Sequence, residues 1–239
     1  MVGPPAPIAS FLITCEHGGN RIPVPYRRLF RGQKALLGSH RGYDPGALTM
    51  ARGLARAFRA PLVTSTVSRL LVDLNRSIGH PQLFSVATRS APAMVREKIV
   101  EQHYRPYRAQ VERLVRQSVS RGRRVIHISS HSFTPELDGE VRLADVGLLY
   151  HPARHGEAKL CARWKASLAA FAPELRVRRN YPYRGKGDGL TSHLRLRFPS
   201  NTYVGIELEI NQSIVLAAGP RWTALRCTLI DSLRAACID

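Results

Sequence analysis

Val125-Ile126-His127-Ile128-Ser129, followed directly by Ser130-His131-Ser132, is the stretch from which the fold of this chain can be predicted. Apolar, β-branched runs of this length are typical of strands that are buried inside a sheet. Segments with helical spacing of apolar residues lie before and after it, so strands and helices alternate along the chain. This alternation favours an α/β fold with helices on both faces of a sheet, in which residues 125–129 form the central strand.

The same reasoning predicts the other elements. Apolar runs predict strands at residues 11–15, 61–67, 70–74, 146–150 and 203–210. Apolar residues spaced three and four apart predict helices at residues 48–58, 100–115, 160–171 and 222–233. Asp44-Pro45 is a strong start signal for the helix at 48–58, with Asp44 as its N-cap.

The composition is that of an ordinary globular protein. Of the 239 residues, 44% are hydrophobic and 22% are charged, so we expect one domain over residues 1–239 with a substantial core. The four cysteines form no CxxC pair and lie in apolar stretches, which predicts buried, reduced thiols. The N-terminus shows no signal peptide, and no apolar run reaches the length of a membrane span, so we expect a cytoplasmic protein.

The charge balance is strongly basic. There are 36 Lys and Arg residues against 17 Asp and Glu, which gives a net charge of +19, and 31 of the 36 are Arg. These residues are spread over the whole chain, without a basic arm, an RNP-like motif or a zinc-finger pattern. A nucleic-acid-binding protein is therefore disfavoured, whereas attraction to small anionic substrates fits the charge.

Two histidines follow predicted strands of the sheet. His17 comes after the strand at 11–15, and His131 comes after the strand at 125–129. Ligands of α/β sheets bind at the carboxyl ends of the strands, so these two side chains can share one metal ion. A catalytic zinc site needs a third ligand, for which Glu16 and Asp44 are the candidates.

Two arginines and two glutamates are candidates for binding an anionic substrate and for transferring a proton, respectively. Arg69 and Arg76 flank the strand predicted at 70–74, and guanidinium groups bind carboxylates through paired hydrogen bonds. In the strand at 203–210, Glu207 and Glu209 face the same side, opposite the apolar residues. A carboxylate beside a metal ion is the usual general base of zinc hydrolases.

Six ordered motifs across residues 12–213 resemble those of the N-formylglutamate amidohydrolase family, which is related to zinc carboxypeptidases and aspartoacylases. The motifs are Cys15-Glu16-His17-Gly18-Gly19-Asn20-Arg21-Ile22-Pro23, Asp44-Pro45-Gly46-Ala47, Ser68-Arg69-Leu70-Leu71-Val72-Asp73-Leu74-Asn75-Arg76, Ser130-His131-Ser132-Phe133, Asn180-Tyr181-Pro182-Tyr183-Arg184-Gly185 and Ile206-Glu207-Leu208-Glu209-Ile210-Asn211-Gln212. The resemblance implies a single three-layer α/β/α domain with a phosphorylase/hydrolase-like mixed sheet.

The resemblance also implies roles for the site residues. One Zn²⁺ is expected on His17, Asp44 and His131, with Glu16 as the reserve ligand. Glu209 is expected to be the general base, and Glu207, which we expect to pair with an Arg, is the alternative.

The remaining residues of the resemblance would act on the substrate. Arg69 would polarise the scissile carbonyl, and Asn75 and Arg76 would hold the substrate carboxylate. Asn180 and Tyr183 are expected to contact the substrate as well.

These roles imply a zinc-dependent amidohydrolase that cleaves the N-acyl amide, and in particular the N-formyl amide, of an acidic amino acid such as glutamate. Family members often carry Asp two residues before the central histidine, where this chain has Ser129. Two other classes stay open at this point: a non-enzymatic protein that binds anions or nucleic acid, and an amidase that uses Cys15 as nucleophile.

Overall fold

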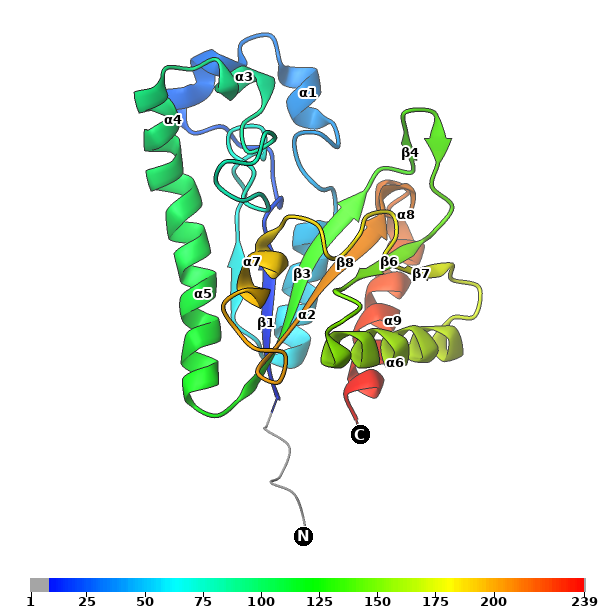
Figure 1. Ribbon diagram of the computed structural model, residues 1–239. Coiled ribbons are helices and arrows are strands. Elements are labelled where there is room, and N and C mark those ends of the chain that lie inside the picture. Colours follow the sequence, from blue (N-terminus) through cyan, green and yellow to red (C-terminus); the bar gives the residue numbers. More distant parts are fainter. Residues whose placement is uncertain (1–8, 239) are drawn as a thin grey trace.

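The structure, a computed structural model, describes residues 9–238 and is built around a six-stranded sheet (Figure 1). Its strands, in spatial order, are β2 (Leu62–Thr64), β1 (Ala9–Cys15), β3 (Arg124–Phe133), β8 (Tyr203–Asn211), β6 (Val146–Leu149) and β7 (Val177–Arg179). Strand β6 runs antiparallel to β8, and the other neighbouring pairs are parallel. The expected mixed sheet is therefore confirmed, with β3 and β8 at its centre.

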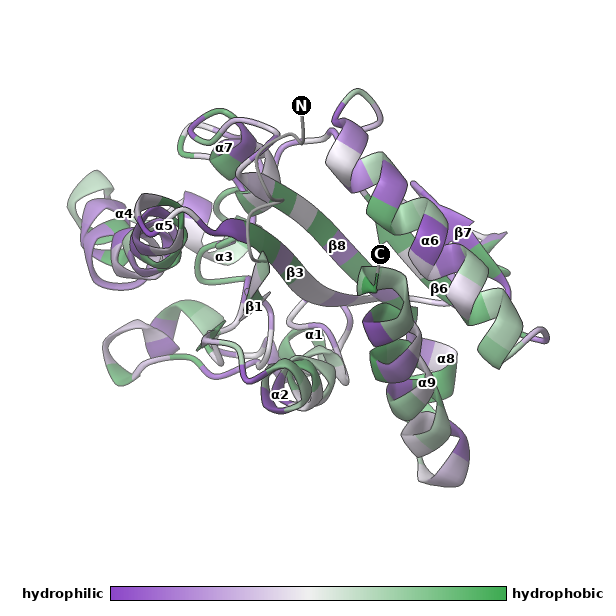
Figure 2. Cartoon of the chain, turned by 90° about the horizontal axis from the view of Figure 1, so that it is seen from below, coloured by the Kyte–Doolittle hydropathy of each residue, from purple (hydrophilic) through white to green (hydrophobic). Residues whose placement is uncertain are grey.

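Helices cover both faces of this sheet, which confirms the three-layer α/β/α arrangement (Figure 2). One hydrophobic cluster joins the sheet to α2 (Ala47–Phe58), α6 (His155–Phe171) and α9 (Gly219–Cys237). On the opposite face, a second cluster includes η1 (Val24–Phe30), α4 (Ala93–Ile99), α5 (Arg105–Ser120) and α7 (Leu190–Arg195). Shorter elements complete the described chain: α1 (Lys34–Gly38), α3 (Val86–Arg89), the π-helical turn η2 (Val100–Tyr104), the hairpin β4 (Glu136–Leu137) and β5 (Glu140–Val141), and α8 (Gln212–Leu216).

The two central strands have one apolar and one polar face. Ile126 and Ile128 of β3 belong to the cluster on the α2 and α9 side, as do the alternate residues of β8 from Val204 to Ile210. The other face of the two strands carries His127, Ser129, His131, Glu207 and Glu209. Because β3 is buried on both sides, each of these polar groups needs a partner or a function.

Three expected strands differ from the observed elements. The central strand continues to Phe133, because β8 pairs with it as far as Asn211, so Ser130-His131-Ser132 lie inside the strand and not after it. Residues 70–74 form turns instead of a strand, although their apolar side chains are buried in the second cluster. The strand at 61–67 shortens to β2, Leu62–Thr64. Apolar runs predict burial, and they do not distinguish a buried turn from a strand.

Asp44 is not the N-cap of α2, contrary to the expectation. The cap residue is Gly46, with a φ of 79°, and no side chain caps the helix. A Cβ at Gly46 would lie 2.5 Å from Cγ1 of Val215, so both conformation and packing favour glycine there. The Asp44 carboxylate is therefore available for another role.

The cysteine prediction is correct only in part. Cys15 and Cys161 are buried, but Cys227 is exposed and Cys237 is partly exposed. Within residues 9–238, no helix combines the length and apolar character that crossing a bilayer requires. The segment Met1-Val2-Gly3-Pro4-Pro5, on which the signal-peptide prediction was based, lies outside the described residues. That residues 1–239 form a single domain stays a prediction.

Candidate active site

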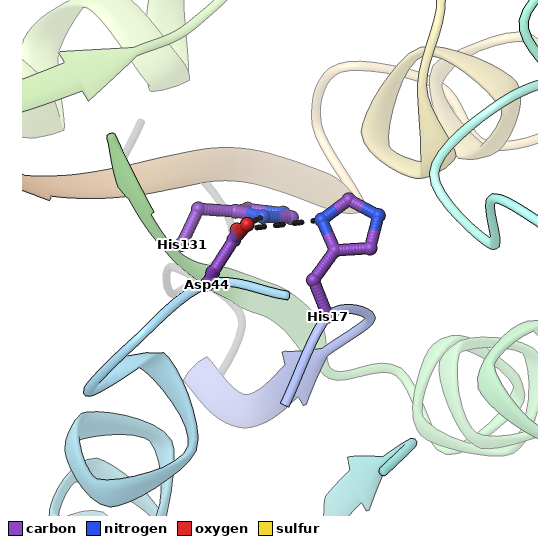
Figure 3. A group of neighbouring side chains, drawn as sticks. All are labelled: His17, Asp44 and His131. Atoms are coloured by element: carbon purple, nitrogen blue, oxygen red, sulfur yellow. Dashed lines mark hydrogen bonds and ion pairs between the residues drawn. The ribbon is translucent and has the colours of Figure 1, made fainter. Parts of the chain in front are cut away.

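Three side chains from separate elements converge at the carboxyl ends of the central strands (Figure 3). His17 follows β1, Asp44 precedes α2, and His131 lies near the end of β3. The Asp44 Oδ2 atom lies 3.3 Å from Nδ1 of His17 and 2.9 Å from Nδ1 of His131. One potential ligand atom from each residue lies within 4.8 Å of the other two. The geometry thus brings together the three residues that the sequence suggested as metal ligands.

The second nitrogen of each imidazole has its own carboxylate partner. His17 Nε2 lies 2.7 Å from Oδ1 of Asp73, and His131 Nε2 lies 3.0 Å from Oε2 of Glu16. Because each Nε2 is held by its carboxylate, Nδ1 is the nitrogen of each ring that faces Asp44, and it can bind a metal ion once it has released its own proton. Carboxylate–histidine pairs of this kind fix the ring orientation of metal-binding histidines.

Glu16 is therefore a partner of His131 and not a reserve ligand of the group. Its carboxylate also accepts hydrogen bonds from the Tyr107 hydroxyl, at 2.8 Å, and from the Ser129 hydroxyl. The Ser129 oxygen itself lies 2.9 Å from Nε2 of His131. At the position of Ser129, where the resemblance implies Asp, the orienting carboxylate comes instead from Glu16 at the end of the neighbouring strand, and Ser129 connects it to His131.

Asp73 is the site residue that the sequence analysis missed. Its Oδ2 atom accepts hydrogen bonds from Nε and Nη2 of Arg69, at 3.2 and 2.8 Å, while its Oδ1 atom contacts His17. The available signal was a single carboxylate inside the apolar run Leu70-Leu71-Val72-Asp73-Leu74. A buried carboxylate in such a run requires a cationic or hydrogen-bonding partner.

Charge interactions hold this cluster in its ionised form. Burial raises the pKa of the Asp44 carboxyl, but the His17 and His131 imidazoles and Arg69 outweigh burial, so its pKa lies well below the usual range. The pKa of the Asp73 carboxyl is likewise lowered, because Arg69 and His17 outweigh its burial. For His131, burial lowers the pKa, but hydrogen bonds to Asp44 and Glu16 raise it well above the usual value.

The donor set fits a zinc ion. Two imidazole nitrogens and one carboxylate oxygen are the protein ligands of many catalytic zinc sites, which leave a fourth position open. The Oε2 atom of Glu209 is buried and has no hydrogen-bond partner among the described residues. Glu209 and the three ligand residues line the same cavity, so this unpartnered oxygen is available to a polar group that enters it.

Glu209 and Glu207 differ in their surroundings. Burial raises the pKa of Glu209 to about 8, with further contributions from Asp44 and Glu207, although His131 and Arg69 oppose the rise. Glu207 instead accepts a hydrogen bond from the Thr191 hydroxyl at 2.6 Å. The expected pairing of Glu207 with an Arg is therefore wrong, because α7 places Thr191 against this carboxylate.

A cavity of about 300 Å³ opens over this cluster. Its lining residues are His17, Asp44, Arg69, Asn75, Arg76, His131, Ser132, Tyr183, Arg184, Gly187, Asp188, Glu207 and Glu209. Asn180 does not line the cavity; its side-chain oxygen accepts hydrogen bonds from the backbone N–H groups of Tyr150 and Gly185, at 3.0 and 3.2 Å. These bonds hold the loop that carries Tyr183, and a contact of Asn180 with the substrate stays a prediction.

Arg69 lies in the cavity wall with part of its donor capacity in use. Besides its two bonds to Asp73, it donates from Nη1 to Oδ1 of Asp44 at 3.3 Å. A guanidinium group has five N–H donors, so two of them stay available for an oxygen atom in the cavity. Arg69 can thus orient Asp44 and still donate to a substrate.

Side chains from η2 and α5 hold the turn that carries Asn75 and Arg76. Tyr104 donates its hydroxyl proton to the carbonyl of Arg76 at 2.7 Å, and Arg108 donates to the carbonyl of Leu74 at 3.0 Å. The Asn75 side-chain oxygen accepts a hydrogen bond from the Leu190 N–H at 2.7 Å. These bonds fix the backbone on both sides of Asn75, and they leave the Asn75 amide N–H groups and the Arg76 guanidinium at the cavity wall.

A buried histidine below the site leads to a prediction about stability and pH. His127 Nδ1 lies 2.7 Å from the Tyr203 hydroxyl, and Nε2 lies 2.9 Å from the Thr14 hydroxyl. Burial lowers the pKa of His127 to about 4, against about 6.5 in an unfolded chain. Between these values only the unfolded state binds the proton, so folding stability falls as the pH falls through this window, by about 3 kcal/mol in total.

His127→Gln is expected to remove this pH-dependent part while keeping one side-chain hydrogen bond. Urea unfolding of both proteins without metal, at several pH values from 7 to 4, measures the difference between them. Other buried groups titrate equally in both proteins and cancel in that difference. The same pH dependence in the two proteins would show that His127 is not held neutral.

Fold and site together define a class of protein: an α/β protein with a His/Asp/His group of metal-ligand type at the carboxyl ends of its central strands. The sequence model of the N-formylglutamate amidohydrolase family matches residues 9–216, and the chain belongs to this family. No curated protein matches the chain.

Two solved structures are similar to this one. A gene product of Agrobacterium tumefaciens is 30% identical, with a TM-score of 0.82 over 97% of this chain and 91% of the other. An N-formylglutamate amidohydrolase from Ralstonia eutropha is 19% identical, with a TM-score of 0.70 over 98% of this chain and 94% of the other. The second similarity shows the shared fold.

Proposed function

We propose that this protein is a zinc-dependent amidohydrolase that releases formate from an N-formyl amino acid with an acidic side chain, such as N-formylglutamate. One observation carries the proposal: a single cavity holds the His17, Asp44 and His131 group, a buried carboxylate with an unpartnered oxygen, and several arginines. Family membership supports the same reaction. The site residues below are part of this proposal.

The three ligand side chains would hold the ion at the base of the cavity. Zinc bound there supplies a Lewis acid and lowers the pKa of a water molecule to about 7. Glu16 and Asp73 keep the two imidazole rings oriented toward Asp44 through their Nε2 atoms. The chain thus preorganises the ligands before any ion binds.

Glu209 is the proposed general base. It takes a proton from the attacking water, and it returns this proton to the amide nitrogen as the C–N bond breaks, which yields formate and the free amino acid. Burial raises the pKa of Glu209 above its usual value, which brings it closer to the neutral pH at which a general base exchanges protons efficiently. The two unused N–H groups of Arg69 donate to the carbonyl oxygen as negative charge develops on it.

Asn75, Arg76 and Tyr183 are proposed to bind the amino-acid part of the substrate. All three line the cavity, and the turn of Asn75 and Arg76 is held by Tyr104 and Arg108. A guanidinium group binds a carboxylate through two parallel hydrogen bonds, so Arg76 suits the α-carboxylate. A cytoplasmic location is part of the same proposal.

Cys15 is a poor nucleophile in this structure. Burial, together with the negative charges of Glu16 and Asp44, raises the pKa of its thiol well above the usual value. Its side chain lies in the hydrophobic cluster on the α2 side of the sheet, whereas the cavity opens on the other face. An amidase mechanism through Cys15 is therefore disfavoured.

The experiment is a hydrolysis screen with N-formyl, N-acetyl and N-succinyl amino acids, using the protein after chelation and after reloading with zinc. We expect the zinc-loaded protein to hydrolyse N-formylglutamate and the chelated protein to lose this activity. Binding of N-formylglutamate without hydrolysis would instead favour the anion-binding alternative. Full activity after complete removal of metal would contradict the proposed metal dependence.

A further inference from the structure

Three arginines line the cavity, and their side chains are engaged to different degrees. Arg69 forms ion pairs with Asp44 and Asp73. Arg76 donates from Nη1 to the backbone carbonyl of Asp188 at 3.1 Å. Among residues 9–238, the guanidinium of Arg184 forms no ion pair and no hydrogen bond with another residue, although it lines the cavity. Its positive charge is therefore available in full for a ligand.

The backbone that carries Arg184 is held firmly. The next residue, Gly185, donates its N–H to the Asn180 side-chain oxygen at 3.2 Å, and its carbonyl accepts a hydrogen bond from Arg195 at 2.6 Å. A Cβ at Gly185 would lie 2.1 Å from the backbone nitrogen of Tyr150, so this loop presses directly against the end of β6. The fixed backbone spares a ligand the cost of ordering this loop, so only the Arg184 side chain has to be ordered when a ligand binds.

The same loop is joined to the turn of Arg76. The carboxylate of Asp188 accepts hydrogen bonds from the backbone N–H of Ser77, at 2.9 Å, and from the Ser77 hydroxyl. Together with the Arg76 bond to the Asp188 carbonyl, these contacts connect two segments about 110 residues apart in sequence into one rim. Arg76 and Arg184 are thus two cations on a single connected rim of the cavity.

The neighbouring Tyr183 interacts with Arg142 and not with Arg184. Its hydroxyl accepts a hydrogen bond from Arg142 at 3.0 Å, and the same guanidinium lies 5.1 Å from the centre of its ring. The cavity is also lined by Asp188 and Glu207, whose carboxylates would repel a second anionic group that no cation balances. A ligand with two negative charges therefore needs a second cation besides Arg76.

We propose that Arg184 is the residue that selects for a negatively charged side chain on the substrate, by binding its carboxylate while Arg76 binds the α-carboxylate. The substrate class is then an N-acyl dicarboxylic amino acid, bound as a dianion. This inference rests on the proposed function and adds the residue that decides its substrate preference.

The test compares N-formylglutamate with N-formylglutamine, which has nearly the same shape and lacks the side-chain charge. In the zinc-loaded wild type, kcat/KM is expected to be about 10–100-fold higher for the glutamate derivative than for the glutamine derivative. This ratio corresponds to the free energy that one hydrogen bond between charged groups contributes to binding. Arg184→Gln is expected to abolish most of this preference through KM for the charged substrate, with hydrolysis of N-formylglutamine nearly unchanged. Arg184→Lys is expected to keep part of it.

Lys186→Gln is the matched control, because Lys186 lies two residues away on the same loop, is exposed, and does not line this cavity. It removes the same formal charge and is expected to leave the preference intact. The proposal fails if Arg184→Gln keeps the wild-type preference, if Lys186→Gln loses it equally, or if the wild type shows none.

Failure of the proposed function itself gives a different result, which is no hydrolysis of either substrate by any of these proteins. Calorimetric binding of glutamate and glutamine, the free amino acids, still tests Arg184 in that case. Selective loss of glutamate binding in Arg184→Gln supports the assignment, and equal glutamate binding by wild type and variant overturns it.

Discussion

Replacing Glu209 with Gln is expected to lower kcat for N-formylglutamate by about 10²–10⁴, the usual contribution of a general base. The amide has the size of the carboxylate but cannot accept a proton from water. Zinc occupancy is expected to stay near that of the wild type, because Glu209 is not part of the His17, Asp44 and His131 group. Steady-state kinetics together with metal analysis of the purified variant measure both quantities.

Glu207→Gln is the matched control for this prediction. Glu207 lies two residues earlier on the same face of β8, but its oxygen accepts a hydrogen bond from the Thr191 hydroxyl at 2.6 Å. An amide oxygen can accept that bond as well, so a much smaller loss of kcat is expected. The reverse order of the two effects would identify Glu207 as the base, and full activity of both variants would mean that neither glutamate is the base.

The second large effect concerns the metal ligands. His17→Ala and His131→Ala are each expected to abolish stoichiometric zinc binding and, with it, hydrolysis. Asp44→Ala is expected to do the same, and it does not remove a helix cap, since Gly46 occupies the cap position of α2. Zinc content by metal analysis and secondary structure by circular dichroism separate metal loss from unfolding.

Asp73→Asn provides a graded comparison for these three variants. Asp73 contacts His17 Nε2 and would not touch the ion, so zinc affinity is expected to fall by about 10–100-fold without being abolished. Full zinc occupancy in both histidine variants would place the metal site elsewhere in the protein. An Asp73 variant as defective as His17→Ala would indicate that Asp73 is itself a ligand.

The α/β class and the candidate ligands could be predicted because their signals are local. Alternating apolar runs and helical periodicity do not depend on distant residues, and each of the two histidines comes at or near the end of an apolar run. The assignment of Asp44 depended on the resemblance of its motif, and the reason first suggested by its position, helix capping, was wrong.

Other parts of the site could not be predicted because they depend on contacts between distant segments. Glu16 looked like a ligand because it precedes His17, but the pairing of β1 with β3 places it against the Nε2 atom of His131. Asp73 was hidden in an apolar run that forms turns in the second hydrophobic cluster and not a strand. For Asn180, only the packing of its loop on Tyr150 shows that the side-chain oxygen binds backbone N–H groups.

The sequence by itself determined that strands and helices alternate, which segments are buried, and which side chains are able to bind a metal, because residue type and spacing set burial and ligand chemistry. Tertiary structure alone decided which nitrogen of each histidine is directed at Asp44, which of the two glutamates keeps an unpartnered oxygen, and which arginine keeps its charge unengaged. These properties are set by hydrogen bonds and ion pairs between residues far apart in the chain. Only the register of β3 against β8 and the packing of the loops over the strand ends bring those partners within reach.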